Sequence, residues 1–430
     1  MKFVCSECGS QLPEGTFVYQ CACDGLLEVV HDFAQVDAEK LKRVFAARLA
    51  ERMSIYASGV WRYKELIAPE LVESAICTKY EGNTGLYAAS EAAQQFGGLR
   101  GLWFKAQSEN PSGSFKDNGM TVAVSHGRSL GYTQFACTST GNTSASLAMY
   151  AAFAGDTSCV FVPDKDISLN KVLQTLSYGS KVIRFEGTYD DGIVFLENHA
   201  EALGLYVCNS INPLRIEGQK SIVYEIAQSF NWQLPDWIVL PGGALSNATA
   251  LGKGLRDLKS LGFIERLPRV AVVQAEGASP FHRMMAEGAE ALTPERAPYT
   301  RASALNIGNP PSWRKARRVL EETGGVTLSV SDAEILDAKA VIDRSGIGCE
   351  PASAAALAGL RQLVRDGIAD REETAVCILT GHLLKDTDAL REYHLDGKWP
   401  DAAHRNALLT SSLTREDVGA HLRSFAQTQV

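Results

Sequence analysis

Short apolar runs alternate with longer helical patterns along most of this 430-residue chain, from about Gly85 onward. Most of these runs are continuously apolar, which is typical of parallel strands that helices cover on both faces. Helical patterns such as Ser146–Ala154 and Ser353–Val364 lie between them. The alternation predicts an α/β fold with parallel sheets. We expect strands at 102–105, 134–137, 159–162, 181–184, 205–208, 237–240, 270–274 and 375–379.

The charge balance and the N-terminus limit the classes of partner. The formal net charge is −8, which gives no overall attraction to nucleic acid or to an anionic membrane. No apolar run reaches the length of a membrane span, and the first residues lack the apolar segment of a signal peptide. We therefore expect a cytoplasmic protein without a nucleic-acid or membrane partner.

A single lysine, Lys116, stands in a run of small and turn-forming residues, Asn110–Asp117, just before a helical pattern. Glycine and serine allow the backbone to approach a ligand closely. At a helix N-terminus the positive end of the dipole disfavours an ammonium. Such a lysine can lose its proton and form a Schiff base, although an ordinary solvated loop lysine would look the same.

Three loops follow predicted strands and precede helical or turn patterns, at 138–143, 241–247 and 380–382. In α/β folds, ligands bind beyond the carboxyl ends of the strands, at helix N-termini. The loop at 241–247 offers consecutive backbone N–H groups to a phosphate, but it has neither the P-loop nor the dinucleotide spacing. Ordinary turn chemistry explains any one of these loops, whereas three loops together with Lys116 predict a binding site.

The chain resembles threonine synthases, which are pyridoxal-phosphate (PLP) enzymes of fold type II, from the first cysteines to about residue 390. The run Ser114–Asp117 fits several type II enzymes, while 209–219 and 307–313 are closer to threonine synthase. The matching segments occur in the family's order: 81–84, 110–117, 139–144, 209–220, 241–247, 307–313, 350–353, 380–382 and 385–386.

The resemblance implies the roles of the site residues. Lys116 would be the Schiff-base lysine and would move the protons. Asn142 would hydrogen-bond the phenolic oxygen of the cofactor, and Thr380 would meet its pyridine nitrogen. A hydroxyl there leaves that nitrogen less protonated than a carboxylate would. The cofactor phosphate would be held by Gly243, Ala244, Leu245, Ser246 and Asn247. Substrate binding would fall to Ser139, Thr140, Thr143, Asn209, Ser210 and Arg215.

The reaction implied is γ-elimination and β-addition, in which O-phospho-L-homoserine and water give L-threonine and phosphate. Arg215 suits a phosphate because its guanidinium can bind in a bidentate way. Two alternatives stay open. One is another type II lyase or synthase for a related phospho-amino acid, or a threonine dehydratase-like enzyme, which would not need the segment 209–215. The other is a zinc-ribbon binding module fused to an inactive PLP fold.

Two segments depart from the expected patterns. The family's cofactor-phosphate loop usually reads Gly-Asn-x-Gly-Asn, whereas here Ala244 and Ser246 replace an asparagine and a glycine. Ser246 would then have to adopt the backbone angle of that glycine. Four N-terminal cysteines could bind a structural zinc or stay reduced without metal, because their second pair is one residue shorter than in standard ribbons. They are Cys5, Cys8, Cys21 and Cys23.

The resemblance implies a tryptophan synthase β-like architecture with two parallel-sheet domains and a small ribbon-like module. We expect the cysteine-bearing module at 1–33, a helical extension at 34–80 and a C-terminal helix or tail at 411–430. The large PLP-binding domain would comprise 81–125 and 205–410, and the small α/β domain 126–204. The partners implied are a small phospho-amino-acid substrate and, as in many type II enzymes, a second copy of the chain.

Overall fold

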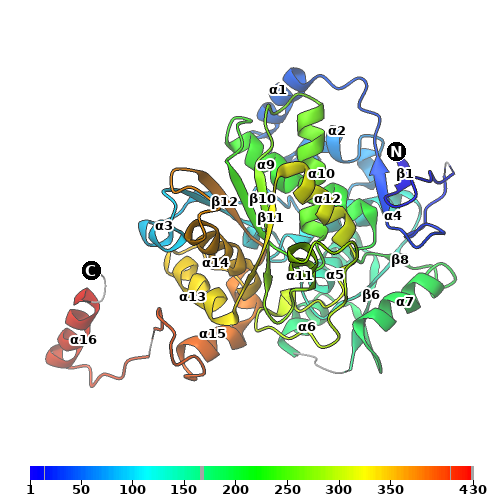
Figure 1. Cartoon of the computed structure of the whole chain (residues 1–430). Helices are drawn as coiled ribbons and strands as arrows, with labels where there is room; N and C mark the ends of the chain where they lie inside the picture. The colour runs from blue at the N-terminus through cyan, green and yellow to red at the C-terminus, as the bar shows by residue number, and fades with distance from the viewer. Residues whose placement is uncertain (14, 165–168, 407, 428–430) are drawn as a thin grey trace.

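A six-stranded sheet forms the centre of the molecule (Figure 1). The computed structural model describes residues 1–13, 15–164, 169–406 and 408–427. Five strands of this sheet pair in parallel, and β3 joins β4 antiparallel at one edge. Their order is β11 (Val326–Val330), β10 (Arg269–Ala275), β9 (Trp237–Pro241), β12 (Thr374–Leu379), β4 (Gly101–Ala106) and β3 (Leu86–Ala88).

Alternate residues of the central strands enter two separate cores. Ile238, Val272 and Val376 pack on one face with helices α9, α10 and α12, whereas Val239, Val273 and Cys377 pack on the other with α3, α13 and α14. Because both faces are covered, the strands read as continuous apolar runs. The covering helices are α3 (Glu91–Gly97), α9 (Ser221–Ser229), α10 (Ser246–Ser260), α12 (Trp313–Thr323), α13 (Asp332–Arg344) and α14 (Pro351–Arg365).

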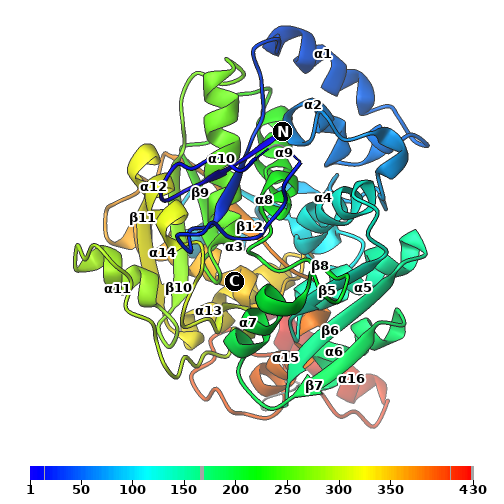
Figure 2. The same ribbon diagram turned by 90° about the vertical axis from the view of Figure 1, so that its right-hand side faces the viewer.

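A second, four-stranded parallel sheet forms a smaller α/β unit (Figure 2). Its order is β7 (Lys181–Phe185), β6 (Thr157–Pro163), β5 (Gln134–Thr138) and β8 (Tyr206–Val207). The eight predicted strands are all present, and the α/β class with parallel sheets is confirmed. Strand β8 pairs with β5, so it belongs to the small sheet although we expected it just inside the large domain. The accompanying helices are α4 (Lys116–Ser129), α5 (Asn142–Ala154), α6 (Leu169–Ser177) and α7 (Tyr189–His199).

The N-terminal module is a two-stranded antiparallel ribbon that packs on the large unit. Strands β1 (Lys2–Cys5) and β2 (Leu27–Val30) pair with each other, and Lys253 and Lys315 donate to the carbonyl oxygens of Val29 and Leu27. Among the described residues, none of the helices combines the length and the apolar character needed to cross a bilayer. The remaining helices are α1 (Ala38–Arg48), α2 (Lys64–Ile67), α8 (Pro213–Gln219), α11 (Pro280–Ala286), α15 (Thr387–His394) and α16 (Arg415–Gln427).

Candidate active site

Lys116 is the first residue of α4, as the sequence predicts. The preceding turn is held by the buried carboxylate of Asp117, which accepts the backbone N–H of Ser112 at 2.6 Å and the hydroxyl of Ser146 at 2.5 Å. Gly113 takes a left-handed conformation with φ 83°, which explains a glycine at this position. The turn therefore presents a half-buried lysine at the N-terminus of a helix.

The environment of Lys116 disfavours its ammonium form. Loss of solvation lowers the pKa of Lys116 to about 7, and the nearby charge of Arg215 adds to this effect. The carboxylate of Glu350 acts in the opposite direction but does not outweigh them. A large share of the Lys116 side chains is thus a neutral amine near pH 7, which is the form that attacks a carbonyl.

Arg215 lies on α8, which crosses α4 at very short range. A Cβ added at Gly218 would lie 1.9 Å from the carbonyl oxygen of Asn118, and one at Gly119 would lie 2.7 Å from that of Arg215. Because two glycines meet at the crossing, the two helices can approach closely. Gly119 lies three residues after Lys116 on α4, and Gly218 lies three residues after Arg215 on α8. The crossing therefore brings α8 close to α4, and the charge of Arg215 acts on the amine of Lys116.

The guanidinium of Arg215 is fully buried and only partly paired. Its Nη1 donates to the carbonyl oxygen of Cys208 at 3.2 Å, but its Nε and Nη2 have no hydrogen-bond partner within the described part of the chain. Burial lowers the pKa of Arg215, although an arginine keeps its charge. A buried cation with two nitrogen atoms that lack a partner within the described residues is arranged for an anion that can bind both of them.

The loop after β12 pairs with the turn that carries Lys116. The N–H of Phe115 donates to the carbonyl oxygen of Thr380 at 2.9 Å, and the N–H of His382 donates to that of Gly113 at 2.9 Å. These bonds join two predicted segments that are far apart in the sequence, and they fix Thr380 beside the lysine turn.

Glu350 lies between the predicted residues Asn142 and Thr380. Its carboxylate accepts the amide of Asn142 at 3.0 and 3.2 Å and the hydroxyl of Thr380 at 3.1 Å. Burial raises the pKa of Glu350, while Lys385 and Lys116 partly counteract this effect. Sequence reasoning placed Glu350 only in a matching segment and gave it no role, because its partners come from distant strands.

The loop after β5 carries four predicted residues at the start of α5. Asn142 is the first residue of this helix, and the hydroxyl of Ser139 accepts the N–H of Gly141 at 3.1 Å. Thr140 and Thr143 are half-buried on the same loop. Asn209 holds the loop's base, because its amide accepts the N–H of Thr138 at 3.0 Å and donates to the carbonyl of Thr138 at 2.9 Å. Its neighbour Ser210 is half-buried next to it.

The loop after β9 leads into the N-terminus of α10. Its left-handed residue is Leu245, with φ 64°, whereas Ser246 already lies in the helix, so the expected glycine-like angle falls one residue earlier. Gly243 has no room for a side chain, since a Cβ would lie 2.9 Å from the carbonyl of Ala304. The buried Nδ2 of Asn247 has no partner among the residues that the structure describes. Free N–H groups at a helix start suit a phosphate.

A bridge between the two sheet units lies close to the site. Lys385 donates to Oε1 of Gln174 at 2.5 Å, and Nε2 of Gln174 donates to the carbonyl of Ser112 at 3.0 Å. Burial lowers the pKa of Lys385. Gln174 belongs to α6 of the small unit, while Lys385 follows β12 of the large one. Nothing in the sequence pattern distinguishes Gln174 from an ordinary helix-surface glutamine.

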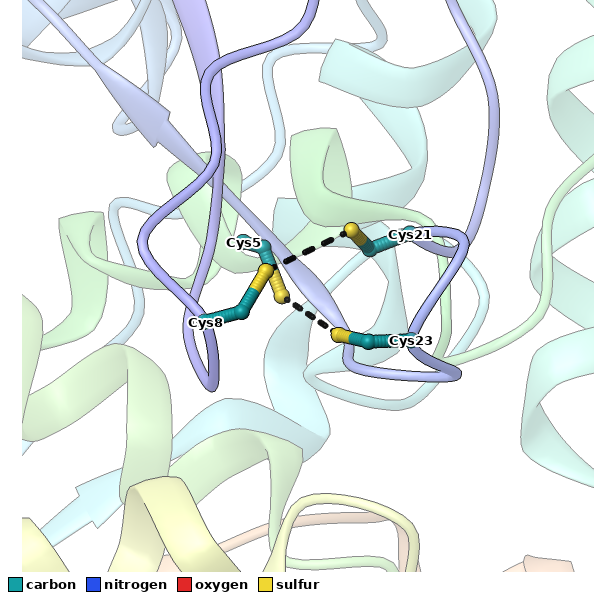
Figure 3. A group of neighbouring side chains, drawn as sticks. All are labelled: Cys5, Cys8, Cys21 and Cys23. Carbon is teal, nitrogen blue, oxygen red and sulfur yellow. Dashed lines mark hydrogen bonds between the residues drawn. The ribbon is translucent and has the colours of Figure 1, made fainter.

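The four N-terminal cysteines form one cluster in the ribbon (Figure 3). Their sulfur atoms all lie within 4.8 Å of one another, with 3.5 Å between those of Cys5 and Cys23 and 3.7 Å between those of Cys8 and Cys21. A Cβ on Gly25 would lie 2.6 Å from the sulfur of Cys5, so the turn requires glycine there.

The sequence is similar to a known enzyme family and to several characterised proteins. Residues 77–381 match the family described as pyridoxal-phosphate dependent enzyme. The chain is 44% identical to "Threonine synthase" of Methanosarcina acetivorans over 89% of its length and 91% of that protein. It is 40% identical to "Threonine synthase" of Methanocaldococcus jannaschii, over 90% and 93% of the two chains.

Solved structures show the same fold at lower sequence identity. Maize serine racemase has a TM-score of 0.60 and 18% identity, and covers 76% of this chain and 95% of its own. Threonine deaminase isoform 2 from Solanum lycopersicum has a TM-score of 0.60 and 17% identity, over 82% and 89% of the two chains.

Proposed function

The chain belongs to the pyridoxal-phosphate-dependent enzymes and, within them, to the threonine synthases, and from that premise we propose which residues perform the reaction. The enzyme converts O-phospho-L-homoserine and water to L-threonine and phosphate. Bound pyridoxal phosphate supplies the electron sink that stabilises negative charge on the carbon atoms of the substrate. The remaining question is what the chain's own residues contribute.

Two groups of buried donors fit the two phosphates that such a site must hold. The cofactor phosphate fits the loop 243–247, which leads from β9 to the start of α10 and contains Asn247, whose Nδ2 has no partner within the described part of the chain. The substrate phosphate fits Arg215, whose buried Nε and Nη2 have no partner among the described residues. Unsatisfied buried donors cost free energy, so they indicate a ligand that pairs with them. The residues present therefore fit the cofactor and a phosphorylated substrate.

Lys116 would bind the cofactor covalently and then handle protons. Its lowered pKa gives a neutral amine that can take the proton from Cα of the substrate and later return it. Asn142 and Thr380, which both bond to Glu350, would orient the cofactor ring. Ser139, Thr140 and Thr143 would bind the amino-acid end of the substrate, with Asn209 fixing their loop.

Arg215 would determine the specificity for a phosphorylated substrate. Phosphate leaves from Cγ and must be stabilised as its negative charge develops, and a preorganised guanidinium does this without further reorganisation. Ser210 lies in the same segment and would contribute its hydroxyl. A dehydratase acting on an unphosphorylated amino acid would leave Nε and Nη2 of Arg215 without an anion to bind, which argues against that alternative. The single observation that supports the proposal is this buried, half-paired guanidinium close to Lys116.

The test measures phosphate and threonine released from O-phospho-L-homoserine. Lys116→Ala should abolish both products. It should also lack the absorption band of the Schiff base between lysine and cofactor, which borohydride removes in the wild type. Arg215→Lys keeps the positive charge but loses the planar guanidinium that can bind a phosphate through two N–H groups. Its kcat/KM should therefore fall by about 100-fold, while the absorption band of the bound cofactor persists. Threonine formation by Lys116→Ala, or full activity of Arg215→Lys, would contradict the assignment.

We propose in addition that the four ribbon cysteines hold a structural zinc. Four thiolates at about 2.3 Å from a tetrahedral zinc lie about 3.8 Å apart, and the sulfur separations of 3.5 and 3.7 Å are close to this value. The same separations are far too long for disulfides. Elemental analysis of protein purified without added zinc tests the site, and a metal content near zero would favour reduced cysteines.

The division into domains and the assembly are proposals as well. We place the large cofactor-binding domain at 81–125 and 205–410, with β8 paired to the small domain at 126–204. We also propose a cytoplasmic homodimer. Light scattering of the purified enzyme gives the mass that checks the dimer.

A further inference from the structure

The buried guanidinium of Arg215 is held by the strand end that precedes its helix. Its Nη1 donates to the carbonyl oxygen of Cys208, the residue directly after β8. Strand β8 is the edge strand of the small sheet, and on its inner side the N–H of Cys208 donates to the carbonyl oxygen of Ala136 in β5 at 2.7 Å. Successive residues of a strand direct their backbone groups to alternate sides, so Val207 directs its N–H and carbonyl away from β5.

Tyr19 of the N-terminal ribbon meets this outer side of β8. The N–H of Val207 donates to the hydroxyl oxygen of Tyr19 at 2.7 Å, and the carbonyl oxygen of Val207 accepts the amide of Asn212 at 2.8 Å. Asn212 also caps α8, because its Oδ1 accepts the N–H of Leu214 at 3.0 Å. Val207 is fully buried, so its N–H would be left without a partner if the Tyr19 hydroxyl were absent. Tyr19 therefore fixes the strand end that supplies the acceptor of Arg215.

The same ribbon also holds the helix that carries Arg215. Nε2 of His31, directly after β2, lies 3.0 Å from Oε2 of Glu217, and both side chains are almost fully buried. Glu217 lies two residues after Arg215 on α8. Lys253 connects Glu217 to the carbonyl oxygen of Val29 in β2. The ribbon thus contacts both the helix that carries the guanidinium and the strand that supplies its acceptor.

The fold of the ribbon places Tyr19. The next residue, Gln20, forms an antiparallel bridge with Leu26, directly before β2. The N–H of Cys21 then donates to the carbonyl oxygen of Gly25 at 2.9 Å. Cys21 belongs to the cysteine cluster (Figure 3), so Tyr19 lies two residues from that cluster. The fold of the cysteine cluster therefore contributes to the position of the Tyr19 hydroxyl.

We propose that Tyr19 is a positioning residue of the substrate-phosphate site, through which the N-terminal ribbon holds Arg215 in the orientation that a phosphate requires. The inference rests on the proposed function, in which Arg215 binds the phosphate of the substrate. Tyr19 acts through Val207 and Cys208. Without its hydroxyl, the strand end shifts to pair the N–H of Val207 with water, and the carbonyl of Cys208 moves with it. Arg215 then loses the geometry that binds a phosphate in a bidentate way.

The first experiment compares Tyr19→Phe with Tyr132→Phe in the holoenzyme. Both variants remove one phenolic hydroxyl beside Tyr206, whose ring centroid lies 6.1 Å from that of Tyr19 and 5.4 Å from that of Tyr132. The hydroxyl of Tyr19, and not that of Tyr132, accepts the N–H of Val207. Tyr132→Phe is therefore the matched control, and its constants should stay near those of the wild type.

Tyr19→Phe should lower kcat/KM for O-phospho-L-homoserine about tenfold, the effect of one lost charge-assisted hydrogen bond. The change should lie mainly in KM, because the substrate phosphate is bound less tightly before and during the reaction alike. The Kd of inorganic phosphate should rise by about the same factor. The affinity for pyridoxal phosphate and the absorption band of its Schiff base should stay as in the wild type, which separates positioning of Arg215 from a general loosening of the fold.

A second measurement needs no variant. Because the coupling between two sites is reciprocal, phosphate bound at Arg215 should stabilise the ribbon. Amide hydrogen exchange of the wild-type holoenzyme, in which the cofactor fills its own phosphate site, is recorded with and without inorganic phosphate. Exchange in residues 17–31 should slow when phosphate binds, whereas exchange in α16 should not change.

Three outcomes would overturn the inference. They are wild-type constants in Tyr19→Phe, equal losses in the two tyrosine variants, and unchanged exchange of the ribbon while phosphate binds, which can be read even if Tyr19→Phe fails to fold. Phosphate binding by Arg215→Lys is measured in parallel. If Arg215→Lys binds phosphate more weakly than the wild type, these outcomes refute the role of the ribbon alone. If it binds phosphate as tightly, the proposed function and the inference fail together.

Discussion

Replacement of Arg215 by methionine should stabilise the protein while removing its phosphate site. Nε and Nη2 of Arg215 are buried without a partner in the described structure, and Nη1 makes one bond at 3.2 Å. Each unpaired donor costs about 1–3 kcal/mol, and the single charge-assisted bond returns about 1.5–3 kcal/mol. Methionine has a similar volume and no donor. We therefore expect Arg215→Met to raise the free energy of unfolding by about 2 kcal/mol.

The assay is urea unfolding of the full-length enzyme, followed by tryptophan fluorescence with and without inorganic phosphate. A ligand at 100 times its Kd adds about 2.7 kcal/mol to the stability of the protein that binds it. The wild type should gain stability with phosphate, whereas Arg215→Met should gain almost none. Arg318→Met, at an exposed arginine, serves as the control and should change stability by less than about 0.5 kcal/mol. Loss of stability in Arg215→Met without phosphate, or equal phosphate effects in both proteins, would refute the reasoning.

Three further outcomes follow from the structure. The rate at which Lys116 binds the cofactor should rise with pH and become constant just above pH 7, because the pKa of Lys116 is lowered to about 7. Arg215→Met should shift this change to higher pH, since the charge of Arg215 contributes to the lowered pKa. Stopped-flow absorbance at a series of pH values measures both rates. Cys8→Ser should lower the zinc content and the thermal midpoint, as emission spectrometry and calorimetry would show, while unchanged zinc would exclude this ligand. Glu217→Gln should cost about 3–5 kcal/mol at pH 7, because it removes the carboxylate that pairs with the buried Lys253, whereas Lys220 keeps its pair with Asp257. The folded state lowers the pKa of Glu217, so Glu217 stabilises the protein above its unfolded pKa, and this stabilisation is lost as the pH falls below about 4.5. The free energies of unfolding of wild type and variant should therefore become similar in acid.

The sequence pattern predicts the framework of this enzyme well. Buried parallel strands read as apolar runs because both of their sheet faces are covered, and all eight predicted strands are present. The start of α4 at Lys116 is likewise visible, because a turn-rich segment and a helical pattern meet there. Strands β3 and β11 were not predicted. Strand β3 has only three residues and lies at the exposed sheet edge, and β11 alternates apolar with polar residues because it is only half-buried over part of its length.

The details that remained hidden depend on contacts between distant segments. Glu350 acquires its partners only when α5, α14 and the loop after β12 converge, and no local pattern encodes that convergence. The backbone angle expected at Ser246 occurs at Leu245. A left-handed leucine costs about 1–2 kcal/mol, but burying its side chain returns about 2–3 kcal/mol, so tertiary packing decides which residue takes this angle.

Helix α8 shows how the fold supports the partly paired Arg215 of its site. Two residues after Arg215, the fully buried carboxylate of Glu217 pairs with Lys220 at 2.6 Å, with Lys253, and with His31 at 3.0 Å. Lys253 also donates to the carbonyl of Val29, so this cluster joins α8 to α10 and to the N-terminal ribbon. A short helix of seven residues has little intrinsic stability, and tertiary contacts must hold it in place. The ion pairs of Glu217 thus help to hold α8 in place, and α8 carries the partly paired Arg215 that would receive the phosphate.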